Sequence, residues 1–111
     1  MPARGEIWLA DPDPSRGREQ AGVRPFVIVS NDYFNRSGYE VVFAAPLTRR
    51  DRGFRLHVPV LPPEGGVRAP GFVMCEQLRS MSLDRFRQRW GELTAATMTE
   101  VDLRIRRLLE P

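Results

Sequence analysis

Apolar residues along the chain fall into short runs with the spacing of β-strands. In Gly5–Ala10, Ile7 and Leu9 alternate with Glu6 and Trp8. Successive side chains of a strand point to opposite faces, so this alternation predicts a strand that turns one face toward a core.

Two runs are apolar on both faces, which predicts central strands covered on both sides: Pro25–Ser30 and Glu40–Thr48. Three further segments have strand-like patterns: Arg55–Leu61, Phe72–Ser80 and Phe86–Leu93. Pro59 lacks the N–H that an interior ladder needs, so its segment is predicted to be an edge strand.

An amphipathic helix is predicted at the end of the chain. Thr94 is a suitable N-cap. An apolar stripe follows at three- and four-residue spacing: Met98, Val101, Ile105 and Leu108. Such a stripe packs on the protein's own core or on another subunit. The whole pattern predicts a mainly β fold of five or six short strands in a small, strongly bent sheet, with one C-terminal helix.

A long polar loop separates the first two predicted strands. Asp11–Gly17 holds turn-forming residues, and Gly17–Pro25 combines a carboxylate, a carboxamide and two guanidiniums. Pro25 biases Arg24 toward an extended backbone, which places Arg24 at the mouth of the next strand. The loop is interpreted either as a plain polar connection or as part of a functional site.

Length and composition indicate one domain, residues 1–111. A chain of 111 residues with 41% hydrophobic residues is large enough to bury a core without disulfides. Cys75 lies in an apolar run and is interpreted as a buried small hydrophobe rather than a nucleophile. No segment resembles a signal peptide, and no apolar run approaches the roughly 20 residues of a membrane span. The prediction is a cytoplasmic protein without a membrane partner.

The basic residues are all arginine except His57, because the chain contains no lysine. The net charge is only +3, yet arginines cluster after the third predicted strand and again near residue 87. Guanidiniums form planar forks for phosphate or carboxylate. This clustering favours a polyanionic partner, either nucleic acid or an acidic protein; a general lack of lysine explains it equally well.

The residue counts and motifs argue against a metal site, a nucleotide cofactor site and a serine triad. One histidine and one cysteine cannot supply a tetrahedral metal set. Glycine-rich nucleotide motifs and a serine triad are missing, so we expect no metal and no cofactor. His57 is predicted to lie on the wetter face of its strand. The polar residues left at strand ends and loops are Glu19, Arg24, Thr48 and Gln77.

Five blocks, in order, resemble the signature segments of MazF/PemK-type toxins: Arg4–Trp8, Glu19–Pro25, Pro46–Thr48, Glu76–Ser80 and Trp90–Thr94. The resemblance extends over nearly the whole chain, from Arg4 to Glu110. It implies a CcdB-like, SH3-like barrel, a homodimer, and a metal-independent, sequence-specific endoribonuclease for single-stranded RNA. It also implies neutralisation by an acidic antitoxin of MazE type.

The resemblance also assigns residues. Arg24 and Thr48 match the family's catalytic arginine and hydroxyl, and Glu19 matches a carboxylate implicated in catalysis in some members. The RNA-binding candidates are Arg18, Gln20, Arg49, Arg50, Arg52, His57, Gln77 and Arg79. Arg18 departs from the family, in which many members have a small serine-like residue, so the substrate preference is open.

The chemistry is consistent with these assignments. RNA is cut when its 2′-oxygen attacks the adjacent phosphate, which leaves a 2′,3′-cyclic phosphate and a 5′-hydroxyl. Arg24 suits stabilisation of the phosphorane charge, Glu19 suits proton acceptance, and Thr48 suits orientation of the phosphate. Two alternatives are a CcdB-like gyrase poison and a non-catalytic SH3-like nucleic-acid-binding module.

Overall fold

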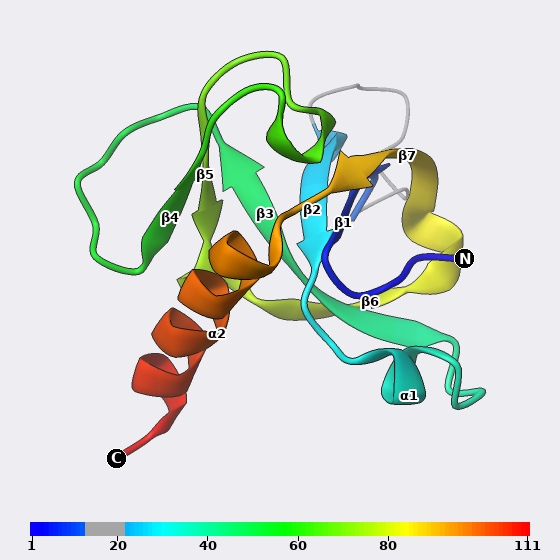
Figure 1. Cartoon of the computed structure of the whole chain (residues 1–111). Coiled ribbons are helices and arrows are strands. Elements are labelled where there is room, and N and C mark those ends of the chain that lie inside the picture. Colours follow the sequence, from blue (N-terminus) through cyan, green and yellow to red (C-terminus); the bar gives the residue numbers. More distant parts are fainter. Residues whose placement is uncertain (13–21) are drawn as a thin grey trace.

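The computed structural model describes residues 1–12 and 22–111, which form one antiparallel sheet and a C-terminal helix (Figure 1). The strands are β1 (Glu6–Ala10), β2 (Arg24–Ile28), β3 (Val41–Thr48), β4 (His57–Val60), β5 (Gly71–Met74), β6 (Arg79–Ser82) and β7 (Phe86–Glu92). The α-helices are α1 (Asp32–Asn35) and α2 (Ala95–Leu109), and the 3₁₀ turns are η3 (Glu64–Gly66), η4 (Cys75–Gln77) and η5 (Leu83–Arg85). The predicted mainly β class with one C-terminal helix is confirmed.

The strand order is β4-β5-β3-β2-β1-β7, with β6 beside β3. One edge of β3 pairs with β2, while its other edge pairs first with β6 and then with β5. Over the described residues the ladder ends at β4 and β7, so the sheet is bent but does not close into a barrel. The predicted edge position of Pro59 is confirmed, because β4 pairs with β5 alone in the described part of the chain.

The predicted strand Phe72–Ser80 is two strands, because η4 interrupts it, and this brings the strands of the described residues to seven. Leu47 pairs with Val73, and Ala44 pairs with Arg79. These two pairs are three residues apart along β3 but six residues apart along the segment from β5 to β6. The three residues of η4 account for the difference. The turn thus lets one edge of β3 serve two partner strands.

Cys75 begins this turn and is fully buried. Burial raises the pKa of its thiol to about 11, so the group stays protonated at neutral pH. The prediction of a buried small hydrophobe is therefore confirmed.

Two hydrophobic clusters cover opposite faces of β3. The larger includes Ala45 and Leu47 and reaches Met98 and Val101 of α2. The smaller cluster is formed by Ala10, Phe26, Ile28, Val42, Ala44 and Met81. Burial of both faces explains why the strands β2 and β3 have apolar residues at successive positions.

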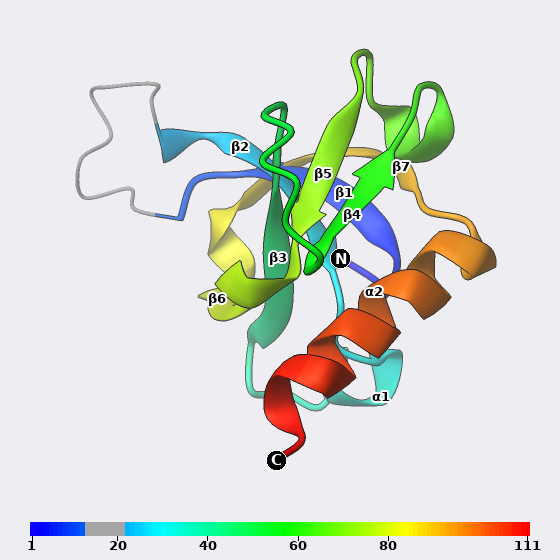
Figure 2. The same cartoon turned by 90° about the vertical axis from the view of Figure 1, so that its left-hand side faces the viewer.

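Helix α2 packs on β4 and η4 (Figure 2). Thr94 caps it as predicted, since its hydroxyl accepts a hydrogen bond of 3.2 Å from the backbone N–H of Thr97. Met98 and Val101 are buried in the larger cluster, whereas Leu108 is 43% exposed. The first half of the apolar stripe is thus intrachain core. No helix in the described ranges is long and apolar enough to cross a membrane.

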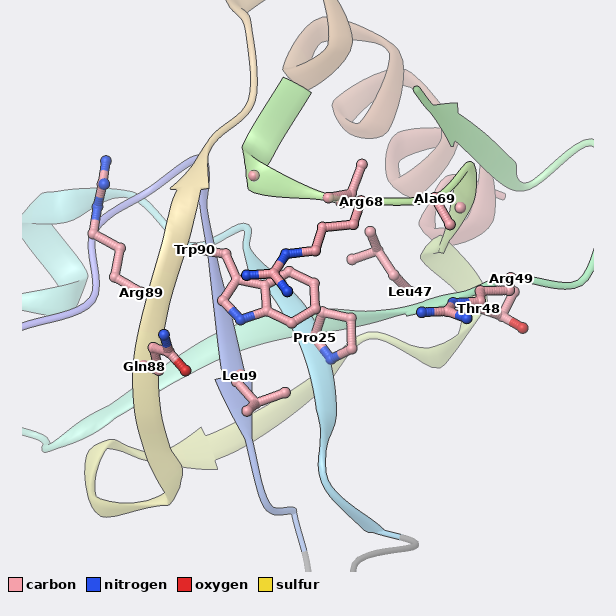
Figure 3. A pocket seen from close by; sticks show the side chains of 13 residues that line it. Leu9, Pro25, Leu47, Thr48, Arg49, Arg68, Ala69, Gln88, Arg89 and Trp90 are labelled. Carbon is pink, nitrogen blue, oxygen red and sulfur yellow. The ribbon is translucent and has the colours of Figure 1, made fainter. Parts of the chain in front are cut away.

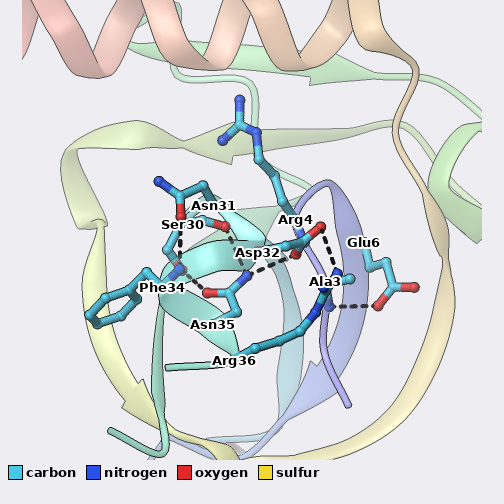
Figure 4. Close-up of polar contacts among 9 residues, drawn as sticks. All are labelled: Ala3, Arg4, Glu6, Ser30, Asn31, Asp32, Phe34, Asn35 and Arg36. Carbon is cyan, nitrogen blue, oxygen red and sulfur yellow. Dashed lines mark hydrogen bonds and ion pairs between the residues drawn. The ribbon is translucent and has the colours of Figure 1, made fainter. Parts of the chain in front are cut away.

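The short helix α1 is held by polar contacts with the N-terminal segment (Figure 4). Asn31 caps it by accepting from the backbone N–H of Phe34 at 2.8 Å. Asp32 accepts from the backbone N–H of Arg4 at 2.8 Å, which lowers the pKa of its carboxyl. The Arg4 guanidinium also donates to Asp102 of α2 at 2.5 Å. These contacts join α1, the N-terminus and α2.

Turn η3 crosses β7 with almost no side chain between the two backbones. A Cβ atom added to Gly66 would lie 2.2 Å from the carbonyl oxygen of Trp90, and one added to Gly91 would lie 2.7 Å from the backbone of Gly65. Glu64 secures the same turn by accepting from the backbone N–H of Thr94 at 2.9 Å. This close crossing fixes the position of the segment 66–71 that follows.

We predict that Gly66→Ala destabilises the fold more than Gly53→Ala. Both glycines have positive φ, at 79° and 69°, so both substitutions carry a similar backbone strain. Nothing lies within 4 Å of a Cβ built on Gly53, whereas one on Gly66 meets backbone atoms. Gly66→Ala should therefore lower the free energy of unfolding by about 1–3 kcal/mol more, measured by urea denaturation. Equal losses would show that the crossing is not tight.

Candidate functional site

A groove of about 480 Å³ lies at one edge of the sheet, where β3 ends and β2 and β5 begin (Figure 3). The segment 66–71 forms the opposite wall. The described residues that line the groove are Leu9, Pro25, Leu47, Thr48, Arg49, Gly66, Val67, Arg68, Ala69, Gly71, Gln88, Arg89 and Trp90. Arg49 and Arg68 are among them and none is acidic, so the lining favours an anion.

Arg24 and Thr48 lie at neighbouring strand ends beside the groove. Arg24 is the first residue of β2 and Thr48 is the last residue of β3, and the antiparallel ladder between these strands ends at Phe26 and Pro46, two residues from each of them. Pro25, which follows Arg24, lines the groove. Arg24 is exposed and is not among the residues that line the groove, whereas Thr48 is partly buried and lines it. The two residues that were predicted as a pair thus lie at the same end of two paired strands, and their joint role stays a prediction.

The Thr48 hydroxyl is positioned by the turn that follows β3. Its Oγ1 accepts a hydrogen bond of 3.2 Å from the backbone N–H of Arg50. A hydroxyl has one donor and two acceptor sites. With an acceptor site used by the turn, the Thr48 O–H remains able to donate to a ligand in the groove.

The arginines near the groove differ in whether a carboxylate neutralises them. Arg87 donates to Asp11 at 3.1 Å, and Arg89 donates to Glu6 at 2.7 Å. Figure 3 shows Arg89 directed away from the groove, on the other side of β7. Within residues 1–12 and 22–111, eight arginine side chains form no ion pair: Arg24, Arg49, Arg50, Arg52, Arg55, Arg68, Arg79 and Arg107. Of these, Arg49 and Arg68 line the groove.

The Glu6 carboxylate accepts hydrogen bonds from more than one group. Partial burial disfavours its charged form, but hydrogen bonds from Trp8 and Arg89 outweigh burial, and the pKa of Glu6 is lowered. The same contact raises the pKa of Arg89. This charge pair is therefore satisfied internally, which leaves the unpaired arginines as the cations available to a ligand.

Of the other predicted RNA-binding residues, some lie at the groove and some lie far from it. Arg49 lines the groove, and Arg50 and Arg52 are exposed in the loop just beyond it. Gln77 and Arg79 lie at the corner between β5 and β6, and Arg79 pairs with Ala44, four residues before Thr48. At about 3.3 Å per residue this separation is roughly 13 Å along β3. Arg18, Glu19 and Gln20 lie outside the described residues.

The prediction that His57 faces solvent is wrong. Its side chain is 3% exposed, and its Nε2 lies 2.9 Å from Oε2 of Glu76. The ring also packs against Phe54, with centroids 5.1 Å apart. His57 pairs with Met74 at the far end of β5 from the groove, so the geometry gives it a structural position rather than a ligand contact.

Arg68, Gln88 and Trp90 line the groove but were not predicted as site residues. The pattern of Phe86–Leu93 contains a usable signal, since alternation places Gln88 and Trp90 on one face of a strand. Arg68 carries no such signal, because its position depends on how η3 crosses β7.

Comparisons with known proteins agree with this geometry. A family model described as a PemK-like, MazF-like toxin of type II toxin–antitoxin systems matches residues 3–109. A crystal structure of MazF from Deinococcus radiodurans superposes with a TM-score of 0.81 at 26% identity, covering 98% of this chain and 96% of that one. An endoribonuclease from a Mycobacterial species gives 0.79 at 26% identity, covering 97% and 90%. An endoribonuclease in complex with its cognate antitoxin, also from a Mycobacterial species, gives 0.80 at 25% identity, covering 98% and 95%.

Proposed function

Because this chain belongs to the family of PemK-like, MazF-like toxins of type II toxin–antitoxin systems, we propose that it cuts single-stranded RNA beside Arg24 and Thr48. Two of the similar structures are named as endoribonucleases. The observation that carries the proposal is that β2 begins at Arg24 and β3 ends at Thr48, at the same end of two paired strands, beside a groove lined by the unpaired Arg49 and Arg68. Residues 1–111 are taken as one toxin domain that acts in the cytoplasm, where messenger RNA is found.

The reaction proposed is attack of the 2′-oxygen on the neighbouring phosphate. The 2′-hydroxyl loses its proton, the new P–O bond forms, and the 5′-oxygen leaves and gains a proton. The products are a 2′,3′-cyclic phosphate and a 5′-hydroxyl. The enzyme must move two protons and stabilise the added negative charge on phosphorus, and no step of this scheme requires a metal ion.

The described residues fit the electrostatic part of this task. The guanidinium of Arg24 forks across two phosphate oxygens and gains most when charge builds up on them. A guanidinium is a poor general base because it holds its proton. The Thr48 hydroxyl, oriented by the backbone of Arg50, donates to a phosphate oxygen. Glu19 remains our proposal for the proton acceptor, on the basis of its match to the family's carboxylate.

The proposal includes two protein partners. One is a second copy of the chain, since Leu108 and Leu109 leave the last turn of α2 partly apolar and exposed, at 43% and 70%. The other is an acidic antitoxin, because the groove that suits phosphates equally suits carboxylates. MazE-MazF complexes from Deinococcus radiodurans are among the structures that this fold resembles.

We expect the pure protein to cut single-stranded RNA in the presence of EDTA and to leave cyclic phosphate and 5′-hydroxyl ends. Arg24→Ala should slow cleavage about 100- to 1000-fold, because one preorganised charge donor is lost. Arg107→Ala is the matched control, since it removes an exposed arginine from α2. Both variants should keep the wild-type melting temperature, and cleavage is followed on an end-labelled oligonucleotide.

Loss of wild-type cleavage in EDTA would contradict the metal-independent reaction. Wild-type rates in a folded Arg24→Ala protein would contradict the assignment of the site. A gyrase poison or a non-catalytic binding module of the same fold would leave the RNA intact under all conditions.

We predict that RNA and the antitoxin compete for the groove. The antitoxin segment should be acidic and should fold on binding, so that carboxylates replace phosphates beside the unpaired arginines. Its association rate should fall as salt rises, because screening weakens attraction between opposite charges. Titration of the complex with RNA carrying a 2′-deoxy nucleotide at the cut site measures the competition. Independent binding of both ligands would rule out a shared groove.

A further inference from the structure

We infer, on the basis of the proposed RNA cleavage, that the groove binds the base of a nucleotide adjoining the bond that is cut. Thr48 belongs both to the proposed catalytic pair and to the lining of the groove. A base held in the groove therefore belongs to a nucleotide next to the reacting phosphate. The sequence preference of the toxin would then be set in part by residues of β7 and of the segment 66–71.

The groove has an apolar and aromatic side suited to the flat face of a base. Leu9, Pro25, Leu47 and Val67 supply apolar surface. Trp90 is half-buried, packs against the larger hydrophobic cluster and also lines the groove. An indole held from one side by a core offers its free side for stacking, which is how proteins bind unpaired RNA bases.

Polar groups complete the site around this apolar side. Gln88 is exposed on the same face of β7 as Trp90, and Figure 3 shows it across the groove from Thr48 and Arg49. Its amide can donate and accept together, as recognition of a base edge requires. Arg68 and Arg49 form no ion pair within the described ranges and can hold the phosphates on either side.

The backbone of the groove wall is in close contact with β7. Gly66 and Gly91 let η3 rest directly on the backbone of β7, so the wall that carries Arg68 is held against the strand that carries Gln88 and Trp90. A wall held by backbone contacts needs less ordering when a base binds against it. An acidic peptide would use the cations, but it would need neither the stacking surface nor the amide at this position.

The test is cleavage of an RNA library randomised around the cut site, compared among the wild type, Gln88→Ala, Trp90→Leu and Trp90→Phe. The wild type should prefer one base at a position next to the cut. Gln88→Ala should still cut but lose about 5- to 150-fold of that preference, the range expected for a lost bidentate base contact. Trp90→Leu should lower kcat/KM by a similar factor, and Trp90→Phe should retain most of it because a ring remains.

Arg68→Ala should raise KM without changing the base preference, and Arg107→Ala should match the wild type throughout. A thermal melt shows whether Trp90→Leu is folded. Because Gln88 is exposed, Gln88→Ala should fold and still tests the base pocket if Trp90→Leu does not fold. A wild-type protein that cuts no RNA would refute the proposed function itself. A wild type that cuts, with an unchanged preference in Gln88→Ala, overturns the base pocket alone. If Gln88→Ala weakened antitoxin binding but left RNA cleavage and its base preference unchanged, the groove would be a peptide site, and the base pocket would also be overturned.

Discussion

The double pairing of β3 is the constraint on which the rest of the structure depends. One edge of this eight-residue strand holds β2, and the other edge is divided between β6 and β5. A divided edge requires the chain to turn at η4, and each face of β3 is covered by its own hydrophobic cluster. Thr48 is the last residue of β3, so the proposed catalytic hydroxyl is positioned by a strand that pairs with three others.

The second constraint is the contact between η3 and β7, which needs glycine on both sides. It brings Arg68 over a sheet edge that otherwise carries only β-strand ends. Two networks then determine which charges are available. Glu6 and Asp11 pair with arginines of β7, and the arginines beside the groove stay unpaired within the described part of the chain. The groove is therefore cationic although the net charge of the chain is only +3.

Local patterns predicted the strands, the Thr94 cap and the edge position of Pro59, because each depends on a residue and its immediate neighbours. They did not predict the break at η4, which follows from register along β3 rather than from any feature of Phe72–Ser80 itself. His57 was misplaced for a similar reason: alternation suggested a wet face, but Phe54 and Glu76 from outside the strand cover it.

The candidate site was predictable only in part. Arg24 and Thr48 stood out because family blocks and strand ends coincide at them. The groove residues Gln88 and Trp90 shared a face in the sequence pattern, yet nothing there indicated that Arg68 would lie opposite them. That relation is set by the glycine crossing, a contact between segments more than 20 residues apart.

The most direct test of the account is a crystal structure with single-stranded RNA that has a 2′-deoxy nucleotide at the cut site. The account predicts the uncut phosphate within hydrogen-bonding distance of the Arg24 guanidinium and the Thr48 hydroxyl, with an adjoining base in the groove beside Trp90. RNA bound at another surface, with the phosphate remote from both side chains, would contradict it.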